Sequence, residues 1–280
     1  MSFFLSDKYY SKVIGRCHHQ QTMDVKEVNI LTVRISVISF EAAVTSVEEL
    51  IASGETHYVC FCNVHTVMTG VDDPDFRRIT NEASLALPDG MPLVWAARMF
   101  GHDQPGRVYG PDMMMALCRK GLYMGYSHFF YGGDTGVLGR LIENLRRLLP
   151  GLKVAGYYSP PFRPLTPEED IQVVDIINNS GAHILWVGLG APKQERWMAE
   201  HRNRINVPVM LGVGAAFDFH SGRIKQAPKW MQNIGLEWLF RLYSDPRRLW
   251  KRYLYNNPRF IYHVSKQILT EYLKSHRTGK

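Results

Sequence analysis

The sequence predicts an α/β fold in which a parallel sheet with crossover helices is followed by a helical, basic C-terminal appendage. From residue 126 onward, an apolar strand, a glycine-containing turn and a helical segment alternate three times, which is typical of parallel strands joined by helices. Past Gly222 this alternation stops, and aromatic, basic helical segments follow that we expect to break at Pro246 and Pro258. The chain therefore divides into a lead-in over 1–28, a Rossmann-like core over 29–222 and an appendage over 223–280.

The first half of the core begins with an alternating strand and a capped helix. Ser39 precedes this helix and can accept its first free backbone N–H groups. Asp73 and Asp75 flank Pro74 in a D-x-D pair of the kind that can bind a metal. Because the pair starts a helix and does not end a strand, we favour capping and assign no metal. The expected elements are strands over 29–37, 56–62 and 85–88, and helices over 40–53, 64–70 and from 74 onward.

The second half of the core carries the repeated strand, turn and helix units. Thr166 and Glu169 form a capping box at the start of one of these helices. The expected elements are strands over 128–131, 152–158, 182–187 and 207–211, and helices over 113–120, 135–149, 166–179 and 193–204.

The bulk composition is that of a soluble globular protein. Of the 280 residues, 45% are hydrophobic and 21% are charged, which allows a sizeable core. We find no apolar run long enough to cross a bilayer, and we expect no secretory signal at the N-terminus. The four cysteines lack disulfide or zinc spacing and the histidines lack ligand spacing, so we expect a reducing cytosol and no histidine-based metal site.

Positive charge is concentrated at the C-terminal end. Residues 221–280 hold 13 lysines and arginines against 3 acidic residues, whereas the whole chain has a net charge of +7. Such asymmetry indicates an anionic partner. Arg241, Arg248 and Arg252 recur at helical spacing, with Lys251 and several aromatic residues interleaved. We favour binding to a membrane surface or a lipid phosphate over an amphipathic helix pair with a solvated basic face, and we favour nucleic acid least.

Three glycine turns follow predicted strands and are candidates for binding a phosphate. Glycine lets backbone N–H groups approach an anion, and the helix N-terminus that follows adds partial positive charge. None fits G-x-G-x-x-G or a Walker A loop, so each alone could be a plain strand-to-helix turn. Together they favour a nucleotide or nucleotide-sugar pocket. The turns are Gly132-Gly133, Gly188-x-Gly190 and Gly212-x-Gly214.

The segment Pro192-Lys193-Gln194-Glu195 opens the helix after the second of these turns. Pro192 suits the first helical position and places Lys193 and Gln194 beside the turn. We expect Lys193 and Glu195 to be charges in a solvated first turn. Gln194 could donate to and accept from sugar hydroxyl groups.

Leu87-Pro88-Asp89-Gly90 places a carboxylate at the end of a short buried strand. In open α/β sheets, ligands collect outside the carboxyl ends of the strands, so Asp89 is a candidate reacting group. The alternative is that Asp89 only caps the helix that follows. This stretch taken alone favours the cap.

Taken together, these motifs resemble the WecG/TagA/CpsF family, glycosyltransferase family 26, over roughly residues 30–255. Each motif is weak alone, but the ordered series is highly specific. The series comprises Asn63, Leu87-Pro88-Asp89-Gly90, Arg107-Val108-x-Gly110-x-Asp112, Gly132-Gly133, Val187-Gly188-x-Gly190-x-Pro192-Lys193-Gln194-Glu195, Gly212-Val213-Gly214-Ala215-x-Phe217-Asp218, Gly222, Ala227-Pro228 and Gly235-Leu236-Glu237-Trp238-x-x-Arg241.

The resemblance implies an inverting transfer of a sugar from a UDP-sugar to a polyprenyl-diphosphate-linked saccharide. This reaction would take place at the cytoplasmic face of a bacterial membrane, on a peripherally bound enzyme that helps to build a surface polysaccharide. The donor sugar stays open between an N-acetylhexosamine, its uronic acid and a hexose. No cofactor is implied, and a homo-oligomer is compatible with the sequence.

The motifs and the resemblance together assign the site residues. One departure from the family is Phe61, which stands where a threonine is frequent, so a contact made by that hydroxyl group would be absent. The assigned residues are Asp89 as the catalytic base; Asn63, Arg107 and Gln194 for substrate; Gly132, Gly133, Gly188, Gly190, Pro192, Lys193 and Asp218 for the nucleotide, with Asp218 reading uracil; and Arg241, Arg248 and Lys251 for the lipid diphosphate.

The chemistry of inversion agrees with a single carboxylate at a strand end. One base takes the proton of the acceptor hydroxyl group, while arginines and helix N-termini can stabilise the leaving UDP without a metal. In this context catalysis is favoured over a cap for Asp89. Two alternatives stay open: a nicotinamide-dependent oxidoreductase, whose fingerprint is missing, and a non-catalytic adaptor that binds a membrane or nucleic acid.

Overall fold

The central feature of the protein is a six-stranded sheet in which every pairing is parallel. The computed structural model describes residues 25–103 and 105–278, so most of the predicted lead-in lies outside the described residues. The strand order is β4-β3-β8-β7-β5-β6, which confirms the predicted α/β fold. The strands are β3 (His57–Cys62), β4 (Leu85–Pro88), β5 (Ser127–Gly132), β6 (Lys153–Tyr158), β7 (Ile184–Gly188) and β8 (Val209–Gly212).

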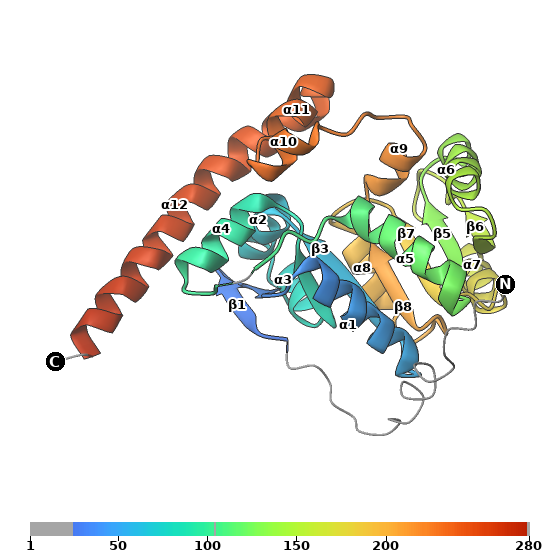
Figure 1. Ribbon diagram of the computed structural model, residues 1–280, viewed down its shortest axis with the longest axis horizontal. Helices are drawn as coiled ribbons and strands as arrows, with labels where there is room; N and C mark the ends of the chain where they lie inside the picture. The colour runs from blue at the N-terminus through green and yellow to red at the C-terminus, as the bar shows by residue number, and fades with distance from the viewer. Residues whose placement is uncertain (1–24, 104, 279–280) are drawn as a thin grey trace, which may run out of the picture.

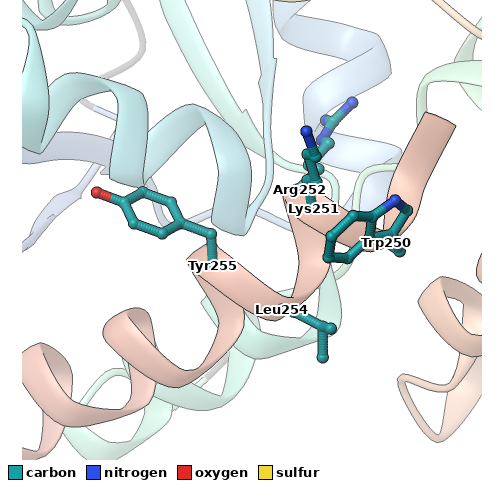
Figure 2. Close-up of a pocket in the computed structure, with 5 residues that line it drawn as sticks. All are labelled: Trp250, Lys251, Arg252, Leu254 and Tyr255. Atoms are coloured by element: carbon teal, nitrogen blue, oxygen red, sulfur yellow. The ribbon is translucent and has the colours of Figure 1, made fainter. Parts of the chain in front are cut away.

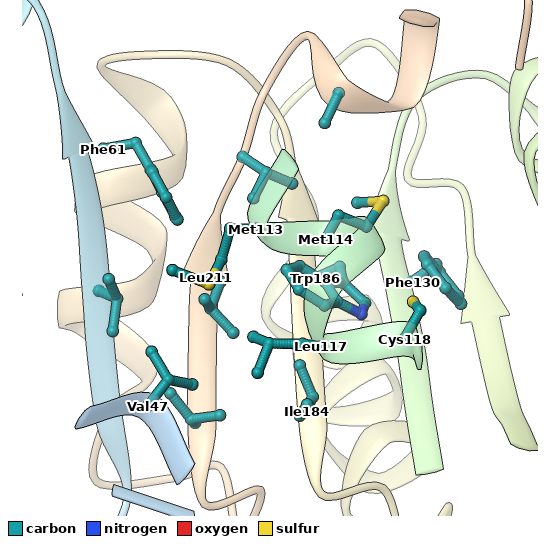
Figure 3. Close-up of a cluster of buried hydrophobic side chains, with 14 of the residues drawn as sticks. Val47, Phe61, Met113, Met114, Leu117, Cys118, Phe130, Ile184, Trp186 and Leu211 are labelled. Atoms are coloured by element: carbon teal, nitrogen blue, oxygen red, sulfur yellow. The ribbon is translucent and has the colours of Figure 1, made fainter. Parts of the chain in front are cut away.

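Helices cover both faces of this sheet (Figure 1). Because side chains alternate along a strand, Trp186 of β7 enters one apolar cluster and Leu185 enters the other. Figure 3 shows the first cluster, where Met113 and Leu117 pack over Trp186 and Leu211. The helices of the core are α1 (Phe40–Ala52), α2 (Val64–Asp72), α3 (Pro74–Asn81), α4 (Met91–Met99), α5 (Gly110–Met124), α6 (Thr135–Leu148), α7 (Pro167–Asn178), α8 (Lys193–His201) and α9 (Ala216–His220).

Local capping signals in the sequence are realised in the structure. The Ser39 hydroxyl group accepts the backbone N–H of Ala42, and Thr166 and Glu169 make a complete capping box. Asp73 caps α3 by accepting the backbone N–H of Phe76. The predicted capping role of Asp73 is therefore confirmed.

Two predicted elements differ from the structure. Residues 29–37 do not form one strand but belong to the antiparallel hairpin of β1 (Glu27–Ile30) and β2 (Val33–Ser36). Leu31 adopts a left-handed backbone with φ of 59° at the turn, a conformation that leucine rarely adopts and therefore does not signal. The predicted break at Pro258 is also wrong, because this proline lies inside the long helix α12. Phe260 and Val264, which follow it, are buried against the core and hold the helix in place.

The appendage consists of α10 (Lys229–Asn233), α11 (Glu237–Ser244) and α12 (Pro246–Thr278). In Figure 1, α12 runs diagonally past α2 and α4 and extends away from the sheet. The helix is fastened to the core by the ion pair of Arg259 with Asp72 and by the side chain of Gln267, which bonds to the backbone at Asn29 and Leu31. Within 25–103 and 105–278, no helix combines the length and apolar character needed to cross a membrane.

Candidate active site

The candidate residues gather at one edge of the sheet. Since all six strands are parallel, their carboxyl ends meet at this edge, where ligands collect in open α/β sheets. Asn63 follows β3 and Asp89 follows β4, on neighbouring strands. The glycine turns continue the same edge. β8, β7 and β5 end at Gly212, Gly188 and Gly132, and Gly214, Gly190 and Gly133 lie just beyond these ends.

Asp89 faces the start of α5 and does not cap the helix that follows it. Its Oδ1 accepts the backbone N–H of Gly110 at 3.3 Å, whereas Gly90 is the N-cap of α4 and supplies no side-chain bond. Burial raises the pKa of Asp89 to about 6; the positive charge of Arg107 opposes this rise and the negative charge of Glu237 adds to it. A carboxylate with this pKa is suited to accept a proton near neutral pH.

Asn63 and Phe61 lie at the end of β3, on the strand next to that of Asp89. The Asn63 Oδ1 accepts the backbone N–H groups of His65 and Thr66, at 3.0 and 3.3 Å, and so caps α2. Phe61 is buried, and its ring packs against Gly110. A Cβ added to Gly110 would lie 3.7 Å from this ring. The aromatic ring therefore packs beneath the start of α5 at the position where the family frequently has a threonine hydroxyl group.

Arg107 connects the core to the appendage. Its Nε donates to the backbone carbonyl of Asp89, and its Nη2 forms an ion pair with Glu237 at the start of α11. The guanidinium also lies 4.1 Å from the centre of the Tyr109 ring, and the Tyr109 hydroxyl group donates to Glu237 at 3.1 Å. Sequence reasoning gave Glu237 no role, although the residue stands in the series that carries the family resemblance.

Gln194 ties two of the glycine turns together. Its Oε1 accepts the backbone N–H of Gly190 at 3.1 Å, and its Nε2 donates to the carbonyl of Gly212 at 2.6 Å and to Glu195 at 3.0 Å. The side chain is 4% exposed, so the predicted contact of its amide with a sugar would require these bonds to open. The structure thus places Gln194 behind the edge of the sheet, and the substrate contact stays a prediction.

Lys193 and Glu195 are on opposite sides of the first turn of α8. Lys193 is exposed, as predicted. The prediction for Glu195 is wrong, because the side chain is 0% exposed and burial raises its pKa to about 7. The pattern of charges in the sequence did not indicate this burial. In the structure, the side of the first turn of α8 that carries Gln194 and Glu195 faces the sheet.

The glycines of the turns differ in how much space surrounds them. A Cβ on Gly132, whose φ is 119°, would lie 2.6 Å from the backbone of Gly188, and a Cβ on Gly188 would lie 2.6 Å from the Phe217 ring. These two glycines are therefore required by close packing. Gly190 also has a positive φ, 78°, but no atom lies within 4 Å of its added Cβ. Space for a ligand is thus present at Gly190.

Asp218, the predicted uracil reader, lies on the side of the core that faces the appendage. It forms a 3.7 Å ion pair with Arg223, which also contacts Asp134 at 2.7 Å. Burial raises the pKa of Asp218, and the charges of Arg223, Arg248 and Arg241 oppose this rise. A ligand atom between Asp218 and the appendage would therefore meet a mixed field of one carboxylate and several guanidinium groups.

The basic residues of the appendage separate into two groups. Arg252 lines the cavity beside Asp89 together with Arg241, and its Nε atom has no hydrogen-bond partner among the described residues. The pKa of Arg252 is lowered to about 10, chiefly by burial and also by the charges of Arg241 and Arg248. Arg248 is exposed and pairs with Asp245 at 2.7 Å.

Lys251 does not line this cavity. It is exposed, and its Nζ lies 5.6 Å from the centre of the Trp250 ring at an outer hollow of α12. Figure 2 shows Lys251 and Arg252 in this hollow, with Trp250, Leu254 and Tyr255 projecting away from them. The structure therefore points to Arg252, and not to Lys251, as the partner of Arg241 at the site.

A cavity of about 540 Å³ brings together Asn63, Asp89, Arg107, Arg241 and Arg252. The other predicted site residues do not line it: the glycine turns, Pro192, Lys193, Gln194, Asp218, Arg248 and Lys251. Its floor is formed by the residues that follow β3 and β4, and its walls by α4, α11 and α12. Polar groups from the core and from the appendage both face it, so the site is complete only with the appendage in place. Those polar groups include Asn63, His65, Asp89, Arg107, Glu237, Arg241, Arg252 and Asn256.

The chain is similar to known proteins over most of its length. Over 223 residues, which are 80% of this chain and 84% of the relative, the sequence is 29% identical to an N-acetylglucosaminyldiphosphoundecaprenol N-acetyl-beta-D-mannosaminyltransferase from Bacillus spizizenii (strain ATCC 23059 / NRRL B-14472 / W23). Residues 28–274, almost the whole of the described structure, match the glycosyl transferase WecG/TagA/CpsF family. The chain therefore belongs to the WecG/TagA/CpsF family of glycosyl transferases.

Proposed function

We propose that this glycosyltransferase moves a sugar from a UDP-sugar to a saccharide carried on a polyprenyl diphosphate, with inversion at the anomeric carbon and without a metal. The acceptor class is supported by the name of the Bacillus relative, which acts on a diphosphoundecaprenol-linked sugar. The observation that carries the proposal is the position of Asp89, a carboxylate of raised pKa, beside Arg107, Arg241 and Arg252 in one cavity.

In the proposed reaction the acceptor hydroxyl oxygen attacks the anomeric carbon of the donor from the face opposite UDP. Asp89 takes the hydroxyl proton as the new carbon–oxygen bond forms. The bond between the anomeric carbon and the diphosphate oxygen breaks, and its electron pair leaves with UDP. Arginine side chains stabilise this developing negative charge and fulfil the role that a metal serves in other transferases.

The nucleotide half of the donor is proposed to bind along the edge formed by the glycine turns. Gly133, Gly190, Lys193 and Asp218 belong to this edge, and the open space at Gly190 supports close approach of a phosphate to the backbone. The acceptor diphosphate is proposed to bind Arg241 and Arg252. The donor sugar, an N-acetylhexosamine, its uronic acid or a hexose, is to be identified by screening.

We further propose that the enzyme binds the cytoplasmic face of a membrane through the appendage. Large side chains are exposed there beside basic ones: Trp250 is 46% exposed, Tyr243 is 87% exposed, and Lys251 lies next to Trp250. Amphipathic helices with aromatic and basic side chains bind the headgroup region of anionic bilayers.

A ligand screen followed by a transfer assay tests the proposed function. Thermal unfolding is measured with UDP, NAD or ADP, each with EDTA or with added divalent metal. A ligand at about 100 times its dissociation constant stabilises by about 2.7 kcal/mol, so we expect a shift with UDP in EDTA. UDP-sugars that shift the transition are then assayed with N-acetylglucosaminyl diphosphoundecaprenol, and the product's anomeric configuration is read by NMR. A shift with NAD alone, or a strict need for metal, would contradict the proposal.

A further inference from the structure

The cavity at Asp89 continues as a groove between α4 and α12. On α12 its lining extends from Arg252 to Ile268, a distance of about 24 Å at 1.5 Å per helical residue. On α4 it extends from Met91 to Met99. α4 begins two residues after Asp89, and α12 runs beside α4 in Figure 1. The groove is therefore much longer than a sugar site requires.

The chemistry of the groove changes along its length. The end near the sheet carries Asp89, Arg107 and Arg252, whereas the distant end carries Met99 and Ile268. Between these ends the walls contain apolar side chains that remain open to solvent. A continuous apolar surface of this kind on a soluble protein marks a binding site.

Each wall carries a regular apolar stripe, and on α12 the side chains of Asn257 and Ser265 also line the groove. Met91, Trp95 and Met99 are four residues apart on α4, so they share one face of that helix. Trp95 is 41% exposed and Met99 is 59% exposed. On α12 the lining residues Leu254, Ile261 and Ile268 recur every seven residues, and Ile261 is 64% exposed. The two stripes face a common space that a hydrocarbon would fill.

We infer that this groove holds the first isoprene units of the acceptor's polyprenyl chain. The inference rests on the proposed function and deepens it. An acceptor of this class is a sugar, a diphosphate and a hydrocarbon in that order, and the cavity offers Asp89, the arginines and the apolar stripes in the same order. The hydrocarbon enters the groove because removal of apolar surface from water is favourable.

The groove is also continuous with the surface that we propose to meet the membrane. Leu254 and Arg252 line both the cavity and the outer hollow at Trp250. The cavity and the outer hollow therefore adjoin at Arg252, at the end of the groove that we propose for the diphosphate.

Soluble acceptors of graded length test the inference without a membrane. N-acetylglucosaminyl diphosphates with chains of one to four isoprene units are assayed without vesicles or detergent. We expect KM to fall several-fold with each added unit until the groove is full, and kcat to change little. Met99→Ser should raise KM for the four-unit acceptor at least fivefold and leave KM for the one-unit acceptor unchanged. Leu148→Ser, an equally exposed apolar position on α6 outside the groove, is the matched control.

Binding of prenyl diphosphates that carry no sugar separates failure of the groove from failure of the transfer reaction. Thermal shifts with diphosphates of one to four isoprene units should grow with length in the wild type and shrink in Met99→Ser. Trp95→Ser serves as a second variant, although its ring also packs against Gly235. If the thermal shifts do not depend on chain length, the groove is not a prenyl site and the inference is wrong. The inference is also wrong if Met99→Ser leaves these shifts unchanged and alters only the sedimentation of the protein with vesicles.

Discussion

Arg107 of the core and Glu237 of α11 form an ion pair beside the backbone of Asp89. Their side chains are 15% and 12% exposed, so solvent screens the pair little. Arg107 also donates to the Asp89 carbonyl, which fixes the guanidinium between the candidate base and the appendage. Because the charges of Arg107 and Glu237 act on Asp89 in opposite directions, movement of α11 would change the pKa of the base.

Replacement of Glu237 by glutamine tests this coupling. Loss of one partner leaves Arg107 with an unmatched charge in a largely buried place, so we expect a destabilisation of about 1–3 kcal/mol. The negative charge of Glu237 helps to raise the pKa of Asp89, so the acid limb of kcat/KM should also move to lower pH. Denaturant unfolding and a pH profile measure the two effects. Glu82→Gln, which breaks an exposed pair with Arg78, should cost less than about 1 kcal/mol and leave the profile unchanged.

Replacement of Asp89 by asparagine should remove transfer while the fold is retained. Loss of a general base costs about 10²–10⁴-fold in rate. In the wild type, kcat/KM should fall as the pH drops below about 6, because Asp89 becomes protonated. Full activity of Asp89→Asn would show that Asp89 is not the catalytic base.

The same substitution should stabilise the protein at neutral pH. The pKa of Asp89 is raised from 3.8 to about 6 in the folded state, because burial favours the neutral carboxyl group. The contribution of this neutral group to folding stability is therefore fully present below pH 3.8 and is lost as the pH rises through 6. At 1.36 kcal/mol per pKa unit, the ionised carboxylate costs about 3 kcal/mol above that window. Asp89→Asn should recover part of this free energy at pH 7.5 and none at pH 4. Denaturant unfolding at both pH values checks the sign, and equal stabilisation at both would contradict it.

Arg252 and Lys251 form a matched pair of neighbouring cations. Arg252 lines the cavity and Lys251 does not. Since a hydrogen bond to a charged group contributes about 1.5–3 kcal/mol, Arg252→Ala should weaken binding of a soluble prenyl diphosphate by about 10–100-fold. Lys251→Ala should change it less than threefold but weaken sedimentation with anionic vesicles. Equal effects of both substitutions on the soluble ligand would contradict this division.

The sequence predicted the sheet and the position of Asp89, because strand, turn and helix signals are local. It could not predict the pairing of Arg107 with Glu237, which are separated by 130 positions and meet only through the packing of α11. The sequence also could not show that Arg252 lines the cavity and Lys251 does not, for a different reason. Consecutive residues lie about 100° apart on a helix, and exposed apolar side chains around α12 obscure which face meets the core.

Burial of Glu195 was missed because polar residues at a helix start ordinarily face solvent. Here the Gly190 turn brings the first turn of α8 against β8, where Gln194 bonds to the Gly212 carbonyl and Glu195 lies behind it. Such packing depends on strands that are distant in sequence. The capping residues Ser39 and Thr166 were found correctly because their partners lie within three residues.

Two glycine substitutions separate packing from ligand binding in the turns. In Gly190→Ala the positive φ costs about 1–2 kcal/mol, but open space surrounds the new Cβ, so the protein should remain folded. Its thermal shift with UDP should shrink, because the methyl group occupies the approach to the backbone. In Gly132→Ala the Cβ meets the backbone of Gly188 at 2.6 Å, so the strand ends must separate and the loss of stability should be larger. An unchanged UDP shift in Gly190→Ala would place the nucleotide elsewhere along the edge of the sheet.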